Sequence, residues 1–128
     1  MQLQTELSEL HAEHDEWQDK IRSYRHEIHE MNTSLEEIVS KSPTTEDLVK
    51  VEHFQNQLIR QREVLDILRH NFKQHENLIE AKEDNPDHLE ISDQRLLESH
   101  KMYRQELDDF ERLFNELRQE FNSFVAKV

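Results

Sequence analysis

A continuous heptad stripe runs along the N-terminal third of this chain and limits the folds that it can adopt. Its positions alternate four and three residues apart for ten consecutive steps, which is the a/d pattern of a helix that packs along its whole length. Every member is apolar or aromatic except His14, which stands where an aliphatic side chain is expected. The stripe consists of Leu3, Leu7, Leu10, His14, Trp17, Ile21, Tyr24, Ile28, Met31, Leu35 and Ile38.

The same period returns in two later segments of the chain. The second stripe consists of Val51, Phe54, Leu58, Gln61, Leu65, Leu68, Phe72, His75 and Ile79. The third consists of Leu89, Asp93, Leu96, His100, Tyr103, Leu107, Phe110, Phe114, Leu117, Phe121, Phe124 and Val128. We therefore expect three helices, over about residues 3–39, 45–82 and 87–126.

Two proline-containing segments separate the predicted helices. In the first, Ser42 before Pro43 can act as an N-cap, and Thr44 followed by Asp47 resembles a capping box. In the second, Asn85 is the expected cap of the third helix. Connections as short as these place successive helices antiparallel to each other.

The composition agrees with long helices. The chain has no glycine, which tight turns and phosphate-binding loops usually need, and 35% of its residues are charged and interleaved with the apolar stripes. The sequence predicts a single all-α domain over residues 1–128, an antiparallel up-down-up three-helix bundle with long coiled-coil-like helices. The alternative is a coiled coil in which extended helices pair between chains, and the two turn signals favour the intramolecular bundle.

Charge and residue usage exclude several classes of function. The net charge of −13 opposes binding to nucleic acid or to an anionic membrane surface, and no segment has the apolar length of a membrane span. There is no cysteine and no signal-peptide pattern, so a cytoplasmic protein is expected. We find no nucleophile–base set and no phosphate loop, and therefore predict a non-enzymatic protein without a cofactor, unless it binds a transition metal.

Polar residues interrupt the stripes at one predicted height in the bundle. Folding the chain about its two turns places the histidines of the first two stripes about 3 Å apart along the axis, with the third-helix residues within about 6 Å of that level. Two glutamates flank them at boundary positions. The predicted layer comprises His14, His75, His100, Asp93, Glu13 and Glu76.

Three interpretations of this layer remain open. It can be a hydrogen-bonded layer that fixes helix register, which the sequence favours, or a transition-metal site. It can also be pH-responsive, because burial lowers a histidine pKa and makes protonation oppose folding. Another pair of histidines on the first predicted helix, His26 and His29, is expected on the surface, where it could chelate a metal only adventitiously.

Two segments carry a resemblance. The runs Leu10–Trp17 and Val51–Gln57, together with His70 and His75-Glu76, resemble parts of small uncharacterised bacterial all-helical proteins. This resemblance implies a bacterial, cytoplasmic protein and carries no activity. In architecture, the helix lengths and Trp17 in the first helix are also similar to a spectrin-type repeat.

Surplus apolar residues on the second helix suggest a function. Val49, Ile67 and Leu78 lie almost opposite the stripe on a helical wheel, and Ile59 also lies outside it. The favoured hypothesis is therefore a helical bundle that acts by self-association, as a homodimer, or by binding a protein partner through this helix. The alternative is a metal-binding protein that uses the polar layer.

Overall fold

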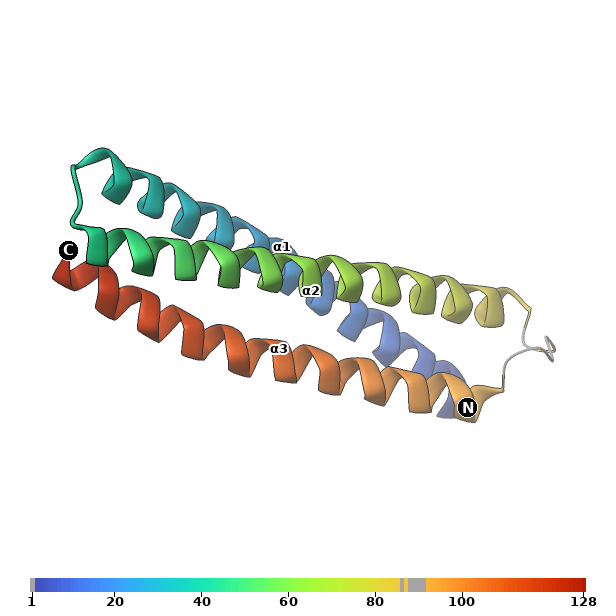
Figure 1. Ribbon diagram of the computed structural model, residues 1–128. Helices are drawn as coiled ribbons and strands as arrows, with labels where there is room; N and C mark the ends of the chain where they lie inside the picture. Colours follow the sequence, from blue (N-terminus) through green and yellow to red (C-terminus); the bar gives the residue numbers. More distant parts are fainter. Residues whose placement is uncertain (1, 86, 88–91) are drawn as a thin grey trace.

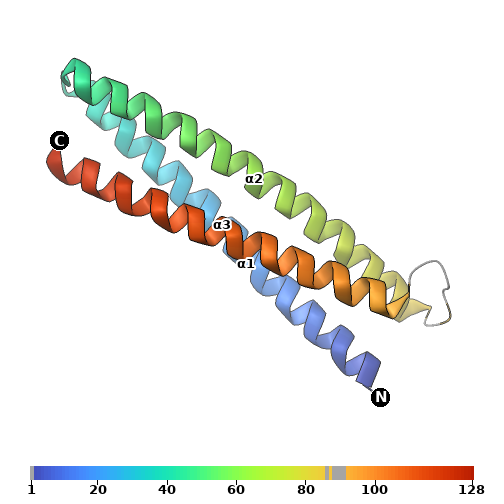
Figure 2. The same cartoon turned by 60° about the horizontal axis from the view of Figure 1, so that its bottom comes forward.

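The computed structural model describes residues 2–85, 87 and 92–128, with side chains from Ser8 onward. Over these residues the chain forms three α-helices and no strand (Figure 1). Figures 1 and 2 show α1 and α3 running in the same direction with α2 antiparallel to both. The predicted three-helix all-α bundle is thus confirmed. The helices are α1 (Gln2–Ser40), α2 (Thr45–Asp84) and α3 (Asp93–Lys127).

The first turn uses one of the two predicted capping signals. The N-cap of α2 is Thr44, whose hydroxyl accepts a hydrogen bond from the backbone N–H of Asp47 at 3.0 Å. Ser42 is not a cap; it has a left-handed backbone with φ of 54°, which reverses the chain after α1. Two acidic residues in the first turn, Glu46 and Asp47, add a favourable interaction with the positive end of the helix dipole.

The second turn differs from the sequence prediction. Asn85 caps the C-terminus of α2 rather than the N-terminus of α3, and its backbone N–H bonds the carbonyl of Ala81. The N-cap of α3 is Ser92, whose hydroxyl accepts from the N–H of Arg95 at 3.2 Å. The third helix therefore begins at Asp93 instead of near residue 87, and the expected core position Leu89 lies outside the described residues.

The core follows the three stripes. Its larger cluster extends from Trp17 towards the turn between α1 and α2, where α3 contributes a run of phenylalanines. A second, smaller cluster lies towards the other end of the bundle and consists of Leu10, Ile79 and Leu96, one residue from each helix. Tyr24 and Tyr103 are only partly buried, and Val128 is 53% exposed.

Ion pairs at seven-residue intervals fix the register of α1 against α3. Each pair joins residues 91 apart in the chain, which is the constant offset expected between two parallel helices. Exposed pairs contribute about 0–1 kcal/mol each, so their main effect is on register. They are Glu13–Arg104 at 2.6 Å, Lys20–Glu111 at 3.2 Å and Glu27–Arg118 at 2.7 Å.

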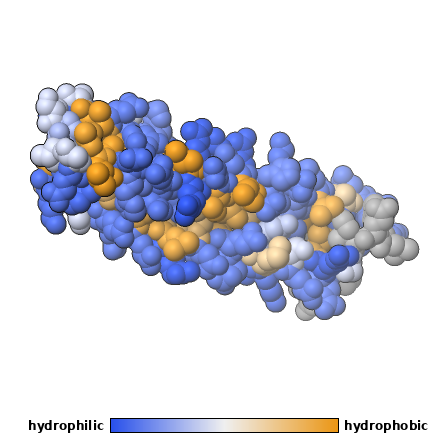
Figure 3. Space-filling model, in the orientation of Figure 1, coloured by the Kyte–Doolittle hydropathy of each residue, from blue (hydrophilic) through white to orange (hydrophobic). Residues whose placement is uncertain are grey.

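The face of the molecule that Figure 3 displays is mainly hydrophilic. Figure 3 shows apolar side chains scattered among polar ones along the face that it displays. The four residues predicted to form an interface on α2 are exposed: Val49 by 64%, Ile59 by 57%, Ile67 by 60% and Leu78 by 39%. Among the described residues, no helix is long and apolar enough to cross a membrane.

Candidate functional site

Three histidines, one from each helix, meet inside the bundle. His14 of α1, His75 of α2 and His100 of α3 are each at most 2% exposed. Their ring centroids are 5.0 Å apart for His14–His75 and for His14–His100, and 5.6 Å apart for His75–His100. One ring nitrogen from each residue lies within 4.8 Å of the other two. We call these three residues the histidine layer.

Each imidazole of the histidine layer donates one hydrogen bond outwards. His14 donates from Nδ1 to the Glu76 carboxylate, and His100 donates from Nε2 to the Glu13 carboxylate. His75 donates from Nε2 to the backbone carbonyl of Leu96 at 3.1 Å. Carboxylate and carbonyl oxygens only accept, so the proton of each neutral ring must be on the outward nitrogen.

The inward nitrogens are consequently lone-pair acceptors. His14 Nε2 and His75 Nδ1 face each other at 3.0 Å, although neither carries a proton when both rings are neutral. His100 Nδ1 is buried and has no hydrogen-bond partner among the described residues. Three Lewis bases therefore converge with no donor between them from the part of the chain that the structure describes, which is unfavourable unless a cation is shared.

The outer carboxylate of Glu13 is held by an arginine. Arg104 donates to both Glu13 oxygens, at 2.9 Å from Nε and 2.6 Å from the terminal nitrogen. Hydrogen bonding to Arg104, opposed by partial burial and reinforced by His100, lowers the pKa of Glu13 to about 2. Glu13 is thus ionised at neutral pH, as an acceptor for His100 must be.

The outer carboxylate of Glu76 has a different partner. Its second oxygen pairs with Nδ1 of His11, whose Nε2 pairs with Glu83. Burial alone would lower the pKa of His11, but Glu76 and Glu83 together outweigh it and raise the pKa. Through its two ring nitrogens His11 thus bridges Glu83 and Glu76 and helps to position Glu76 against His14.

Burial keeps the histidine layer neutral. Desolvation lowers the pKa of His14 and of His100, and it lowers the pKa of His75 to about 4. The two flanking carboxylates partly oppose this shift at His14 and His100. At pH 7 the rings are therefore in the unprotonated form that binds metal ions.

Aromatic rings enclose the layer on the side of the larger core cluster. Trp17 stacks on His100 with 4.5 Å between centroids and lies 5.0 Å from His14. Tyr103 meets His75 edge-on at 5.2 Å. These contacts restrict ring rotation, so the imidazoles are held in the orientation that directs one nitrogen of each inwards.

The three imidazoles and the acceptors of their outward N–H groups resemble the ligands of a metal site and the residues that orient such ligands. Imidazoles that bind metals commonly donate their other N–H to a carboxylate or a backbone carbonyl, as all three rings do here. Nitrogens bound to one tetrahedral ion at about 2.0–2.1 Å lie about 3.4 Å apart. The present separations of up to 4.8 Å therefore need a modest inward movement of the rings to hold an ion.

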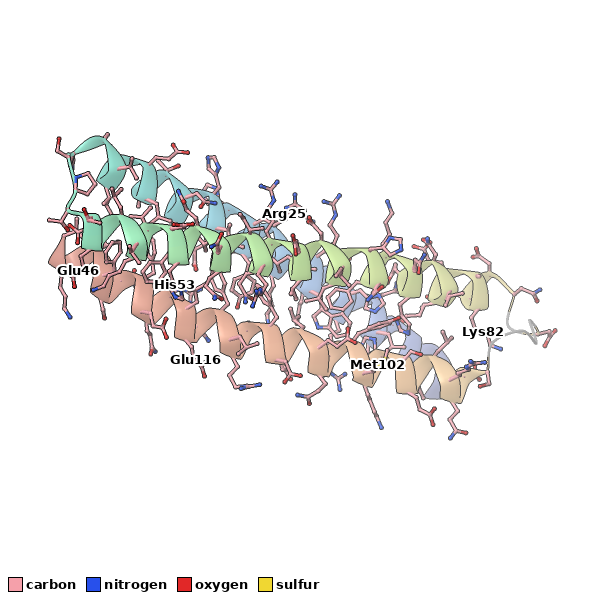
Figure 4. All side chains as sticks on the ribbon, in the orientation of Figure 1. Arg25, Glu46, His53, Lys82, Met102 and Glu116 are labelled. Carbon is pink, nitrogen blue, oxygen red and sulfur yellow. The ribbon has the colours of Figure 1, made fainter. Side chains whose placement is uncertain are left out.

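Asp93 is not part of the layer, contrary to the sequence prediction. It is the first residue of α3, its side chain is 42% exposed, and it lies 3.5 Å from the ammonium of Lys82. Seven residues separate Asp93 from His100, which corresponds to about 10 Å along the helix. Lys82 marks this end of the bundle in Figure 4, and Glu46 marks the other. By contrast, the predicted glutamates Glu13 and Glu76 do contact the layer, since they accept hydrogen bonds from His100 and His14, respectively.

Sequence reasoning also missed partners of the layer. The Leu96 carbonyl and the Trp17 stacking carry no sequence signal, since both depend on how the helices meet. Arg104 could have been found, because Glu13 and Arg104 belong to the heptad series of oppositely charged residues on α1 and α3. His11, three residues before His14 on the first helix, is likewise absent from the predicted layer.

Comparisons with protein-family models, with curated proteins and with solved structures find no match. The resemblances to bacterial helical proteins and to a spectrin-type repeat thus receive no support from them.

Proposed function

We propose that this protein binds a divalent transition-metal ion in the histidine layer. The observation that supports it best is the convergence of three unprotonated ring nitrogens, from His14, His75 and His100, with no donor between them among the residues that the structure describes. A metal ion converts this repulsive arrangement into three favourable bonds.

The main alternative is a layer that only fixes helix register. Such a layer stabilises a bundle when every buried donor meets an acceptor and no group is left over. Here His100 Nδ1 has no partner among the described residues, and His14 and His75 present acceptor to acceptor. The outward nitrogen of each ring has an acceptor, whereas the inward nitrogens have no donor among the described residues. This difference favours a cation bound between the three rings.

The donor set indicates the class of ion. Three imidazole nitrogens suit Zn²⁺, Ni²⁺, Co²⁺ or Cu²⁺, whereas Mg²⁺ and Ca²⁺ prefer oxygen ligands. The chain has no cysteine and so cannot supply a thiolate. The carboxylates of Glu13 and Glu76 lie behind the rings, where they compensate the charge of the ion and orient its ligands.

The single tryptophan of the chain provides a direct assay. Because the Trp17 ring lies 4.5 Å from that of His100, a paramagnetic ion in the histidine layer should quench its fluorescence. Protein without an affinity tag would be titrated with Ni²⁺ and Cu²⁺, and with Zn²⁺ by calorimetry. We expect one ion per chain and no response to Mg²⁺.

Two variants separate the layer from surface chelation. His100→Leu should abolish stoichiometric binding, because it removes a ligand from a buried position. The control is the double variant His26→Gln and His29→Gln, which removes an exposed histidine pair and should bind as the unaltered protein does. Absence of binding by the unaltered protein, or loss of binding only in the control, would refute the proposal.

A second candidate function is self-association through the outer face of α2. Its support is the exposure of Val49 and Ile67, at 64% and 60%, on one line of the helix, with Ile59 and Leu78 nearby. Light scattering across a concentration series tests it, with Val49→Ser combined with Ile67→Ser as the variant. A strict monomer at all concentrations would exclude this function.

A further inference from the structure

A groove between α1 and α2 is lined mainly by positively charged side chains. It lies in the middle part of the bundle, where Figure 4 labels Arg25, and its volume is about 670 Å³. We call it the cationic groove. Its lining residues are Gln18, Ile21, Arg22, Arg25, Arg69 and Lys73, none of which belongs to the histidine layer.

Two of the four cations in the groove have carboxylate partners. Arg25 donates to Asp66 across the groove at 2.6 Å. Arg22 lies 3.4 Å from Asp19 on its own helix, and both side chains of this pair are about three-quarters exposed. A pair so exposed to water holds its arginine only weakly, so Arg22 can exchange Asp19 for another anion.

The other two cations, Arg69 and Lys73 of α2, form no ion pair with a residue that the structure describes. They are four residues apart on one face of the helix, where like charges repel each other. The antiparallel pairing that brings Arg25 to Asp66 also places Arg22 at the level of Arg69. Positive charge is thus concentrated in one groove of a chain whose net charge is −13.

The types and spacing of these side chains indicate a ligand that carries phosphate. A guanidinium group presents parallel N–H donors that match phosphate oxygens, and a lysine adds a mobile positive charge. From Gln18 to Arg25 the groove extends over seven residues of α1, about 10 Å along the helix axis. This length suits a few linked phosphate groups, and the volume is in the range of about 300–1,000 Å³ that is usual for small-molecule sites.

The surroundings of the groove disfavour a long polyanion. His11, Gln18 and Arg25 are seven residues apart and therefore lie on the same edge of α1. At His11 this edge carries the carboxylates of Glu76 and Glu83. A nucleic-acid strand that continued along the edge would meet these carboxylates, and the net charge of the protein would repel it.

We propose that the cationic groove binds a small molecule with two or more linked phosphate groups. The phosphate oxygens accept hydrogen bonds from Arg69 and Lys73 on α2 and from Arg22 on α1, so that the ligand connects the two helices. The proposal does not depend on the metal site, because none of these residues contributes to the histidine layer.

Calorimetric titration with inorganic pyrophosphate tests this proposal. The protein would first be treated with a chelator and dialysed, so that pyrophosphate cannot bind through a metal ion. We expect one pyrophosphate per chain, with an affinity that falls as the salt concentration rises. Succinate, which has two carboxylates and fewer acceptor oxygens, should bind more weakly, and so should a single-stranded oligonucleotide.

A pair of matched double variants locates the binding. Arg69→Gln combined with Lys73→Gln should weaken pyrophosphate binding about 10-fold or more, because it removes two charged donors. The control combines Arg60→Gln with Lys101→Gln, at exposed positions that do not line the groove. Both double variants remove two positive charges, so they change the net charge equally, and the control should keep most of the affinity.

A third variant is expected to strengthen binding. Asp66→Asn removes the carboxylate that competes for Arg25 and should raise the pyrophosphate affinity about 3-fold. Its control is Asp109→Asn, which removes an equal charge from an exposed pair with Arg112 on α3 and should have a smaller effect.

Selective loss in the groove variant, together with a gain in Asp66→Asn, supports the proposal. No binding of pyrophosphate by the unaltered protein, or equal losses in the two double variants, would overturn it. Succinate binding as tight as that of pyrophosphate would overturn the assignment to phosphate. Tighter binding of the oligonucleotide would overturn the assignment to a small molecule.

Discussion

Replacing His75 with leucine should flatten the acid limb of the stability curve of the metal-free protein. His75 is 2% exposed, and burial lowers its pKa to about 4. In the unfolded chain the pKa returns to about 6.5. Between these values the unfolded state binds more protons than the folded state, so the free energy of unfolding falls as the pH falls.

The size of the effect follows from the two pKa values. The contribution of His75 is fully present above pH 6.5 and declines through the window from 6.5 to 4. At pH 5 the loss amounts to about 2 kcal/mol, and below pH 4 it approaches about 3 kcal/mol. His14 and His100 act in the same direction, because burial lowers the pKa of each.

Urea unfolding at pH 7.5, 6 and 5 in the presence of a chelator measures this difference. The unaltered protein should lose about 1 M or more in its urea midpoint between pH 7.5 and 5, and His75→Leu should lose clearly less. His70→Leu, at an exposed position of the same helix, is the matched control and should behave as the unaltered protein. Equal slopes for the unaltered protein and His75→Leu would show that burial of His75 does not drive the acid response.

Three further outcomes are expected. Thr44→Ala removes the hydroxyl that accepts from Asp47 and should cost about 1 kcal/mol in urea unfolding; an unchanged midpoint would mean that this cap is dispensable. Leu65→Ala, at a side chain that is 0% exposed, should cost about 2–5 kcal/mol, and a loss below 1 kcal/mol would indicate a poorly packed core. Glu13→Gln should weaken metal binding about 10–100-fold in calorimetry, because it changes the acceptor that orients His100; equal affinity would exclude a role for Glu13.

The helices were predictable because their signal is repeated many times. In α1, a heptad stripe of eleven positions places the apolar side chains on one face of a helix, which must be the buried face. The start of α2 is marked by Thr44 and Asp47. The start of α3 was mispredicted because Asn85 and Ser92 are both good capping residues. Local sequence does not decide between two such caps, and here Asn85 ends the preceding helix.

The meeting of the three histidines could be anticipated for a related reason. The two breaks between the stripes set the approximate heights of the antiparallel helices, so the positions of His14, His75 and His100 in their stripes place them near one level. The same estimate failed for Asp93, because it stands at the first turn of α3 and its carboxylate lies beside Lys82. A height estimate gives a level along the axis and says nothing about the direction of a polar side chain at a helix end.

The sequence alone determined the helical period, the number of helices and the level at which polar residues enter the core, since these depend on spacing along one chain. Only the tertiary structure decided which ring nitrogen faces which acceptor, because Glu13, Glu76 and the Leu96 carbonyl reach the rings from neighbouring helices. Those outward acceptors fix the protons on the outer nitrogens. The three inward nitrogens are thereby left as lone pairs, and this arrangement is the physical basis of the proposed metal site.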